Sequence, residues 1–171
     1  MPLLTLWSKF FDLCRLRLKP QDLPYSQAFL NMTLSVYAII SIVLSLIHTS
    51  IFDAILSTII EIGLLIILIS SLLYLVHYPT RIIQTLTALA GASCVLGILS
   101  FPVMYWFEFY RDYEITIPIL LLFGLGVWNF TVYAHVLRHA LAVPFFVGLL
   151  LTFIIFTINF SVLSQILPLT E

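Results

Sequence analysis

Charge is what this sequence has least of. Lys, Arg, Asp and Glu together make up 9% of its 171 residues, whereas hydrophobic residues make up 62%. A soluble domain carries about 25% charged residues, so this chain has too few to cover the surface of a soluble globule. Its net charge of −1 also gives no basic footprint for nucleic acid. The composition therefore excludes an ordinary soluble enzyme, a disordered chain and a nucleic-acid-binding protein.

Cysteine and recognisable catalytic groups are scarce as well. Cys14 and Cys94 stand far apart in apolar surroundings, so the chain has neither a CxxC motif nor the ligand spacing of a zinc site. An intramembrane hydrolase would need a nucleophile with its base, or two acids close together in the membrane. We find no such set and therefore expect a protein that is not an enzyme and holds no metal.

Long hydrophobic runs are what the chain has in abundance. A helix needs about 20 mostly apolar residues to cross the hydrocarbon core of a membrane. The apolar residues run continuously instead of alternating at every second position, which disfavours a β-barrel. The sequence predicts an all-α integral membrane protein with a five-helix bundle over residues 28–166 and a short outer tail over 167–171. The expected spans are 28–47, 54–76, 82–107, 115–137 and 140–166.

The distribution of charge predicts the orientation, because cytoplasmic loops are enriched in Lys and Arg. One side of the predicted membrane holds Lys9, Arg15, Arg17, Lys19, Arg81 and Arg138. The other side holds Asp53, Glu108, Asp112, Glu114 and Glu171, together with Arg111. An odd number of spans separates these groups, so we expect a cytoplasmic N-terminus and a periplasmic C-terminus. A merged fourth and fifth span around 138–142 would place the C-terminus in the cytoplasm instead.

Residues 1–27 form an N-terminal segment ahead of the first span. Apolar side chains recur at every third or fourth position over 2–19, which predicts an amphipathic helix that ends at Pro20. We expect this helix to lie at the cytoplasmic membrane interface, as an anchor or as a docking surface for a partner. The residues expected to make these contacts are Trp7, Phe10, Phe11, Arg15 and Arg17.

Glu61 is the ionisable residue that lies clearly within a predicted span. Such residues are costly in a membrane, so each is a functional hypothesis. The helical rise places Glu61 at the depth of Ser41 in the first span and Asn159 in the fifth, where a protonated Glu61 would hydrogen-bond to Asn159. Three interpretations stay open: a structural clamp between helices, a proton-coupled or ligand-binding carboxylate, and a carboxyl group close enough to the surface to reach water.

A second polar cluster is predicted at the cytoplasmic end of the fourth span, and its members are Asn129, Tyr133, His135, Arg138 and His139. The two histidines are four residues apart and share a helix face, a spacing that is compatible with a metal or a haem. No acid lies between them, so the motif is not HExxH. We expect no cofactor, and we interpret the histidines as interfacial residues that contact lipid headgroups or the N-terminal segment.

The third predicted span is rich in small residues. Ala88 and Ala92 form a pair with small–xxx–small spacing, as do Ser93 and Gly97. Small residues let helices approach closely in a membrane, where no hydrophobic force drives helices together. This span is therefore expected to be the central packing helix.

The order of these parts resembles the Yip family, which comprises Rab-interacting multi-pass Golgi proteins and small inner-membrane relatives in bacteria. The likeness lies in residues 20–24, 81–91, 128–129 and 134–141. It implies five spans after a cytoplasmic N-terminal segment. The long N-terminal extension of the eukaryotic members is missing, so the resemblance implies no Rab partner, and for the bacterial relatives it implies a fold without an established chemistry.

We therefore expect a non-enzymatic scaffold or accessory subunit of a bacterial inner-membrane complex. Its expected partners are membrane lipid and other membrane-protein subunits or further copies of itself. The alternative is a small proton-linked transporter or channel that uses Glu61, although the chain shows no inverted repeat of broken helices.

Overall fold

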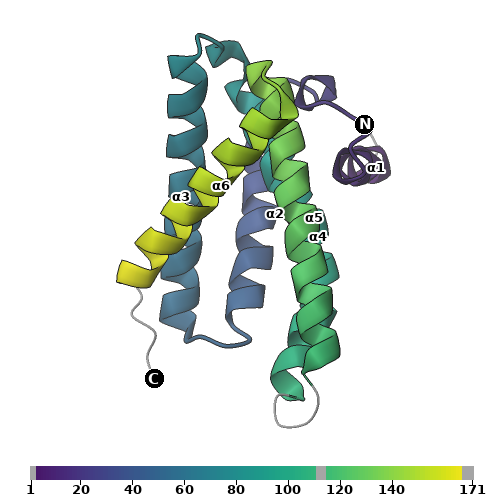
Figure 1. The fold of residues 1–171 in the computed structure, drawn as a ribbon, viewed down its shortest axis with the longest axis vertical. Helices are drawn as coiled ribbons and strands as arrows, with labels where there is room; N and C mark the ends of the chain where they lie inside the picture. The colour runs from purple at the N-terminus through teal and green to yellow at the C-terminus, as the bar shows by residue number, and fades with distance from the viewer. Residues whose placement is uncertain (1–2, 111–114, 167–171) are drawn as a thin grey trace.

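The computed structural model describes residues 3–110 and 115–166, with side chains from Trp7 onward (Figure 1). This part of the chain is all-α. Its helices are α1 (Leu3–Cys14), α2 (Gln27–Ser45), α3 (Ile51–Leu75), α4 (Ile82–Phe109), α5 (Thr116–Leu141) and α6 (Phe145–Ile166), with the short 3-10 helices η1 (Pro20–Asp22) and η2 (Pro79–Arg81).

Five helices, α2 to α6, are long and apolar enough to cross a membrane. This confirms the predicted all-α class and the five candidate spans, and it indicates an integral membrane protein. The outer tail expected at 167–171 lies outside the described residues.

The predicted break between the fourth and fifth spans is confirmed, but it lies further along the chain than expected. Helix α5 continues through Arg138 and ends at Leu141. Ala142 adopts a left-handed conformation with φ 57°, and the Val143 N–H donates to the Arg138 carbonyl oxygen at 3.0 Å. This closure ends the helix, and Pro144 precedes the first residue of α6.

The ends of the bundle differ in charge. The α1 end, as we call it, carries α1, η1, η2 and the α5–α6 turn, and Lys19, Arg81 and Arg138 lie there (Figure 1). Asp53 near the start of α3 and Glu108 near the end of α4 lie at the opposite end. The other charged residues predicted for that side, at 111, 112, 114 and 171, fall outside the described residues.

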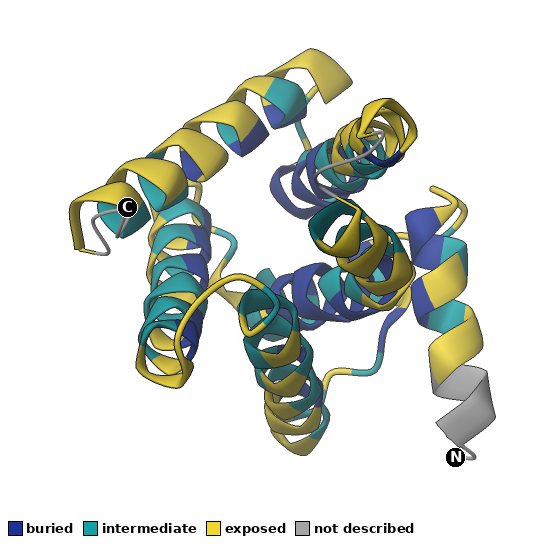
Figure 2. Ribbon diagram, turned by 90° about the horizontal axis from the view of Figure 1, so that it is seen from below, coloured by how far each residue is buried: buried dark blue, intermediate teal, exposed yellow. Residues whose placement is uncertain are grey.

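Helix α4 is the central helix, as its small residues predict. It packs against α1, α2, α3 and α5, and a continuous stretch from Thr85 to Ala92 is buried. Across the bundle, buried residues turn inward and exposed residues turn outward (Figure 2). In a membrane, lipid would cover this outward surface, and apolar side chains there would be at no disadvantage.

Glycine permits two of the close approaches between helices. A Cβ added at Gly91 of α4 would collide with the Phe10 ring of α1. A Cβ added at Gly148 of α6 would lie 2.6 Å from the carbonyl oxygen of Ala134 in α5. Because glycine has no side chain, α1 can dock on α4 at Gly91 and α6 can cross closely over α5 at Gly148.

Helix α1 ends at Cys14, so the prediction that it continues to Pro20 is wrong. Leu16 adopts a left-handed conformation with φ 61°, and the Arg17 N–H donates to the Asp12 carbonyl oxygen at 3.0 Å. The chain then turns back, and Pro20 is buried against the bundle. Amphipathic spacing predicted the helix but not this end, because tertiary contacts of the following segment determine where the helix stops.

Candidate functional site

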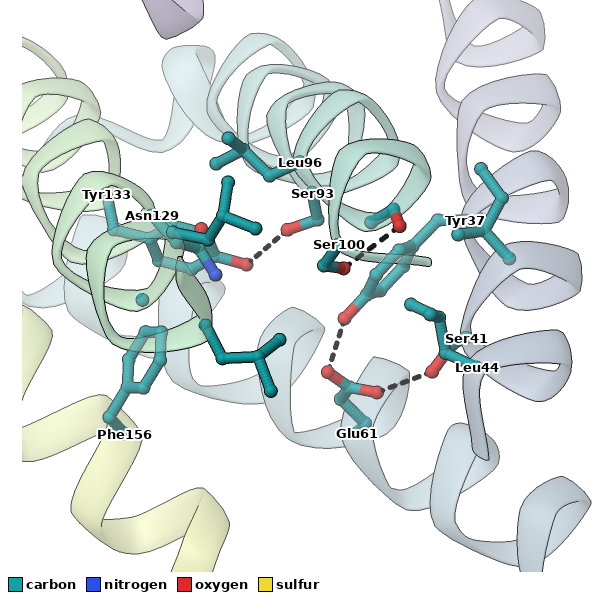
Figure 3. A pocket seen from close by; sticks show the side chains of 15 residues that line it. Tyr37, Ser41, Leu44, Glu61, Ser93, Leu96, Ser100, Asn129, Tyr133 and Phe156 are labelled. Carbon is teal, nitrogen blue, oxygen red and sulfur yellow. Dashed lines mark hydrogen bonds between the residues drawn. The ribbon is translucent and has the colours of Figure 1, made fainter. Parts of the chain in front are cut away.

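Glu61 is held by two hydroxyl groups from a neighbouring helix. Tyr37 Oη donates to Glu61 Oε1 at 2.5 Å, and Ser41 Oγ donates to Glu61 Oε2 at 2.8 Å (Figure 3). Tyr37 and Ser41 are four residues apart on α2, so both project from the same face of that helix. Each carboxyl oxygen of Glu61 therefore has one donor, and the carboxyl group joins α3 to α2.

The predicted hydrogen bond between Glu61 and Asn159 is wrong. In the described part of the chain, Tyr37 and Ser41 are the hydrogen-bond partners of Glu61. Helix α6 crosses the bundle obliquely (Figure 1), and Phe156, one turn before Asn159, reaches the space beside Glu61. The predicted depths of Glu61 and Asn159 hold only for spans that stand upright, and α6 is tilted (Figure 1).

Glu61 lines a cavity of about 310 Å³ inside the bundle. All five spanning helices contribute to its wall, and the cavity lies in the half of the bundle away from the α1 end. Ligand pockets start at about this size, so the space suits one small molecule or a cluster of waters. The polar side chains in the wall belong to Tyr37, Ser41, Glu61, Ser93, Ser100, Asn129 and Tyr133.

Two of the polar residues predicted for the cytoplasmic end of the fourth span, Asn129 and Tyr133, line this cavity instead. The Tyr133 and Ser93 hydroxyl groups share a hydrogen bond of 2.8 Å. Asn129 Oδ1 is buried, and no described residue donates a hydrogen bond to it. The cavity thus contains an acceptor without a partner among the described residues. A buried acceptor of this kind costs free energy unless a ligand or a water donates a hydrogen bond to it.

The remaining members of that predicted cluster lie elsewhere. His135 is buried, and its Nε2 is hydrogen-bonded to the Leu18 carbonyl oxygen at 3.1 Å. The rings of His135 and His139 meet edge to face with their centroids 4.6 Å apart. His135 thus contacts the N-terminal segment, which is one of the two contacts expected of the histidines. Asn129 and Tyr133 separate from them because two residues along a helix correspond to a turn of about 200°.

The described residues contain no group of three or more His, Cys, Asp or Glu side chains that is placed to hold a metal ion. The ring of His135 contacts the ring of His139 and the carbonyl oxygen of Leu18 in the segment that follows α1.

Side-chain hydrogen bonds hold the segment after α1 against the bundle. Gln84 Nε2 donates to the carbonyl oxygens of Gln21 and Leu23 at 3.1 and 2.8 Å. Gln21 Nε2 donates to the His139 carbonyl oxygen at 2.6 Å. Arg81 Nη1 donates to the Ala140 carbonyl oxygen at 2.9 Å, so it satisfies a terminal carbonyl of α5. These contacts position the basic side chains at the α1 end.

The residues expected to dock at the membrane divide into two groups. Phe10 is buried against α4 and stacks on Phe29 with ring centroids 5.7 Å apart. Trp7 and Phe11 remain 41% and 46% exposed, and Arg15 and Arg17 are exposed as well. Helix α1 is therefore attached to the bundle by one face while a second face stays open.

Sequence reasoning missed Tyr37, although a signal for it was present. Tyr37 and Ser41 form an i, i+4 polar pair in the first span, and polar side chains in a membrane find partners on neighbouring helices.

Comparison with models of protein families, with curated proteins and with solved structures finds no match to this chain.

Proposed function

We propose that this chain is a small proton-linked transporter of organic cations in a bacterial inner membrane, with its N-terminus in the cytoplasm and its C-terminus in the periplasm. The observation that carries the proposal is the cavity of about 310 Å³ in which Glu61 lies among the five spanning helices. The separation of basic and acidic residues between the ends of the bundle supports the orientation.

The chemistry of the wall favours a cation with N–H donors. The wall contains the carboxyl group of Glu61 and the unpartnered oxygen of Asn129, and no Lys, Arg or His is among its described residues. A carboxylate in a membrane is costly unless a positive charge balances it. A small organic cation supplies both that charge and a donor for Asn129, while Leu96 and Phe156 contact its apolar part.

Proton coupling follows from the use of a single carboxyl group. Glu61 is neutralised either by a proton or by the cation, so the two compete for the same oxygens. Tyr37 and Ser41 keep those oxygens in place in both states, because hydroxyl groups can rotate to donate or to accept. Release of the cation on protonation would make the protein an exchanger of cations for protons.

Uptake of labelled guanidinium by proteoliposomes tests this proposal, because guanidinium stays charged at every working pH. With an acidic interior, liposomes that contain the full chain should accumulate guanidinium, and Glu61→Gln should abolish accumulation in a folded protein. Asp53→Asn is the matched control, because it removes the same charge from the same helix outside the cavity. Equal uptake by the Glu61→Gln protein, or no uptake above that of empty liposomes, would contradict the proposal.

The second candidate function is the scaffold or accessory subunit. The face of α1 that carries Trp7 and Phe11 stays exposed after Phe10 has docked on α4, and it offers an aromatic surface to a partner subunit or to the membrane interface. A stoichiometric partner that co-purifies with the full chain and is lost in Trp7→Ala/Phe11→Ala would support this function. Membership of the Yip family remains a prediction that implies a fold and leaves both functions open.

A further inference from the structure

A second cavity lies at the α1 end and shares no lining residue with the Glu61 cavity. It has a volume of about 530 Å³, and the segment after α1, η2 and the end of α5 form its wall. The polar residues that line it are Lys19, Gln21, Asp22, Arg81, Arg138 and His139. Three permanent positive charges thus face one space together with one acid.

Asp22 can offset only one of the three positive charges in this cavity. Asp22 accepts a hydrogen bond from the Lys19 backbone N–H at 2.9 Å, and Arg81 donates to backbone carbonyl oxygens of α5. Within residues 3–110 and 115–166, the Lys19 ammonium and the Arg138 guanidinium form no ion pair or hydrogen bond. The positive charge that Asp22 leaves unbalanced is unfavourable unless a further anion lies among these cations.

The location of the cavity identifies the kind of anion. Arg81 precedes the first residue of α4, and Arg138 lies in the last turn of α5, so both stand at the end of a candidate span. This is the depth of lipid headgroups. Phe146 at the start of α6 is 67% exposed and Leu75 at the end of α3 is 76% exposed. Both lie at the α1 end of the bundle, as the cavity does, and offer apolar surface to acyl chains, which a soluble anion would not use.

We propose that this cavity binds the phosphate of an anionic phospholipid. Arg138 and Lys19 provide the free charges, and the planar guanidinium of Arg138 suits a phosphate group because it can donate two parallel hydrogen bonds. Arg81 contributes charge while it holds the end of α5, and the side chain of His139 lines the same wall. Basic pockets between spanning helices on the cytoplasmic side are typical sites for anionic headgroups.

Native mass spectrometry of the full chain in detergent tests the proposal with phosphatidylglycerol and phosphatidylcholine as probes. The unmodified protein should retain phosphatidylglycerol preferentially. Lys19→Gln/Arg138→Gln should bind it about 30-fold more weakly, since each Lys or Arg beside an anionic headgroup contributes about fivefold. The matched control is Arg15→Gln/Arg17→Gln, which removes the same charge from exposed positions outside the cavity and should retain the lipid.

Equal loss of phosphatidylglycerol from both double variants would overturn the proposal, because it would reveal a general attraction of charge. Equal retention of the two lipids by the unmodified protein would do the same. Displacement of phosphatidylglycerol by millimolar inorganic phosphate would show that the site takes free phosphate and not a lipid. If the double variant does not fold, Lys19→Gln alone serves as the test and should weaken retention of phosphatidylglycerol about fivefold. The Lys19 side chain is exposed, so this single substitution should leave the fold unchanged.

Discussion

The hydroxyl group of Tyr37 and the carboxyl group of Glu61 are joined by a hydrogen bond of 2.5 Å between α2 and α3. Ser41, one turn further along α2, completes the pairing of the carboxyl oxygens. This arrangement makes the same group both a contact between two spanning helices and the carboxyl group of the internal cavity. Structural and functional roles of Glu61 therefore have to be separated by substitutions that differ in shape and in hydrogen bonding.

Glu61→Gln should leave the free energy of unfolding nearly unchanged, whereas Glu61→Leu should lower it by about 1–3 kcal/mol. The amide can still accept from Tyr37 and can donate to Ser41, but leucine leaves two hydroxyl groups without their acceptor. Reversible unfolding in mixed micelles measures both changes. A Glu61→Gln protein as unstable as Glu61→Leu would show that the helices need the charge itself.

Tyr37→Phe should lower the free energy of unfolding by about 0.5–1.5 kcal/mol, because it removes one interhelical hydrogen bond and keeps the ring. The same unfolding measurement applies. Tyr25→Phe serves as the control, because Tyr25 is exposed and its loss of a hydroxyl should have no effect. Equal effects of the two substitutions would argue that the bond to Glu61 contributes nothing to stability.

Gly91→Ala should loosen α1 from the bundle. The added methyl group would overlap the Phe10 ring, which is itself stacked on Phe29, so we expect a loss of about 1–3 kcal/mol. Trypsin should then cleave faster after Arg15. Gly63→Ala has open space around its Cβ and should be neutral or stabilising by up to about 1 kcal/mol. If the overlap is the cause, the Gly91→Ala substitution should have little further effect in a Phe10→Ala background.

Cys14 should resist alkylation in the folded protein. Burial raises the pKa of its thiol to about 12 from an ordinary value of 9.0, so the reactive thiolate is rare near neutral pH. In a Cys94→Ala background, maleimide labelling at pH 8 should be slow until the protein is unfolded, whereas Gln27→Cys, at an exposed position, should label at once. Rapid labelling of folded protein would show that α1 detaches.

The same pKa predicts how stability changes at high pH. The unfolded chain loses the Cys14 proton near pH 9, while the folded chain keeps it up to about pH 12. The contribution of the neutral thiol to stability is therefore complete below pH 9 and declines as the pH rises toward 12. Cys14→Ser and Cys14→Ala should differ in stability, because only serine keeps a donor for the Ala92 carbonyl oxygen, which lies near Cys14 Sγ.

The amino-acid sequence was sufficient to predict the five spans and the central position of α4. In lipid every backbone group needs an internal partner, so an apolar run of sufficient length must form a helix. The small residues around Ala88 and Ala92 likewise mark the helix that its neighbours can approach most closely. Helical periodicity also places Asn129 and Tyr133 on a different face of α5 from His135 and His139. All four fall in one predicted cluster when only their depth in the span is considered.

Depth correctly placed Ser41 beside Glu61, but the choice of Tyr37 over Asn159 as the second partner, and the end of α1, depend on tertiary packing. Depth along a helix places residues in a layer, but the tilt of α6 and the rotation of α2 determine that Tyr37 meets the carboxyl group while Asn159 does not. Helix α1 ends at Cys14 because the next segment is drawn onto the ends of α4 and α5. Hydrophobic pattern constrains position along the membrane normal, whereas packing between helices sets tilt and rotation, and both polar cavities depend on these.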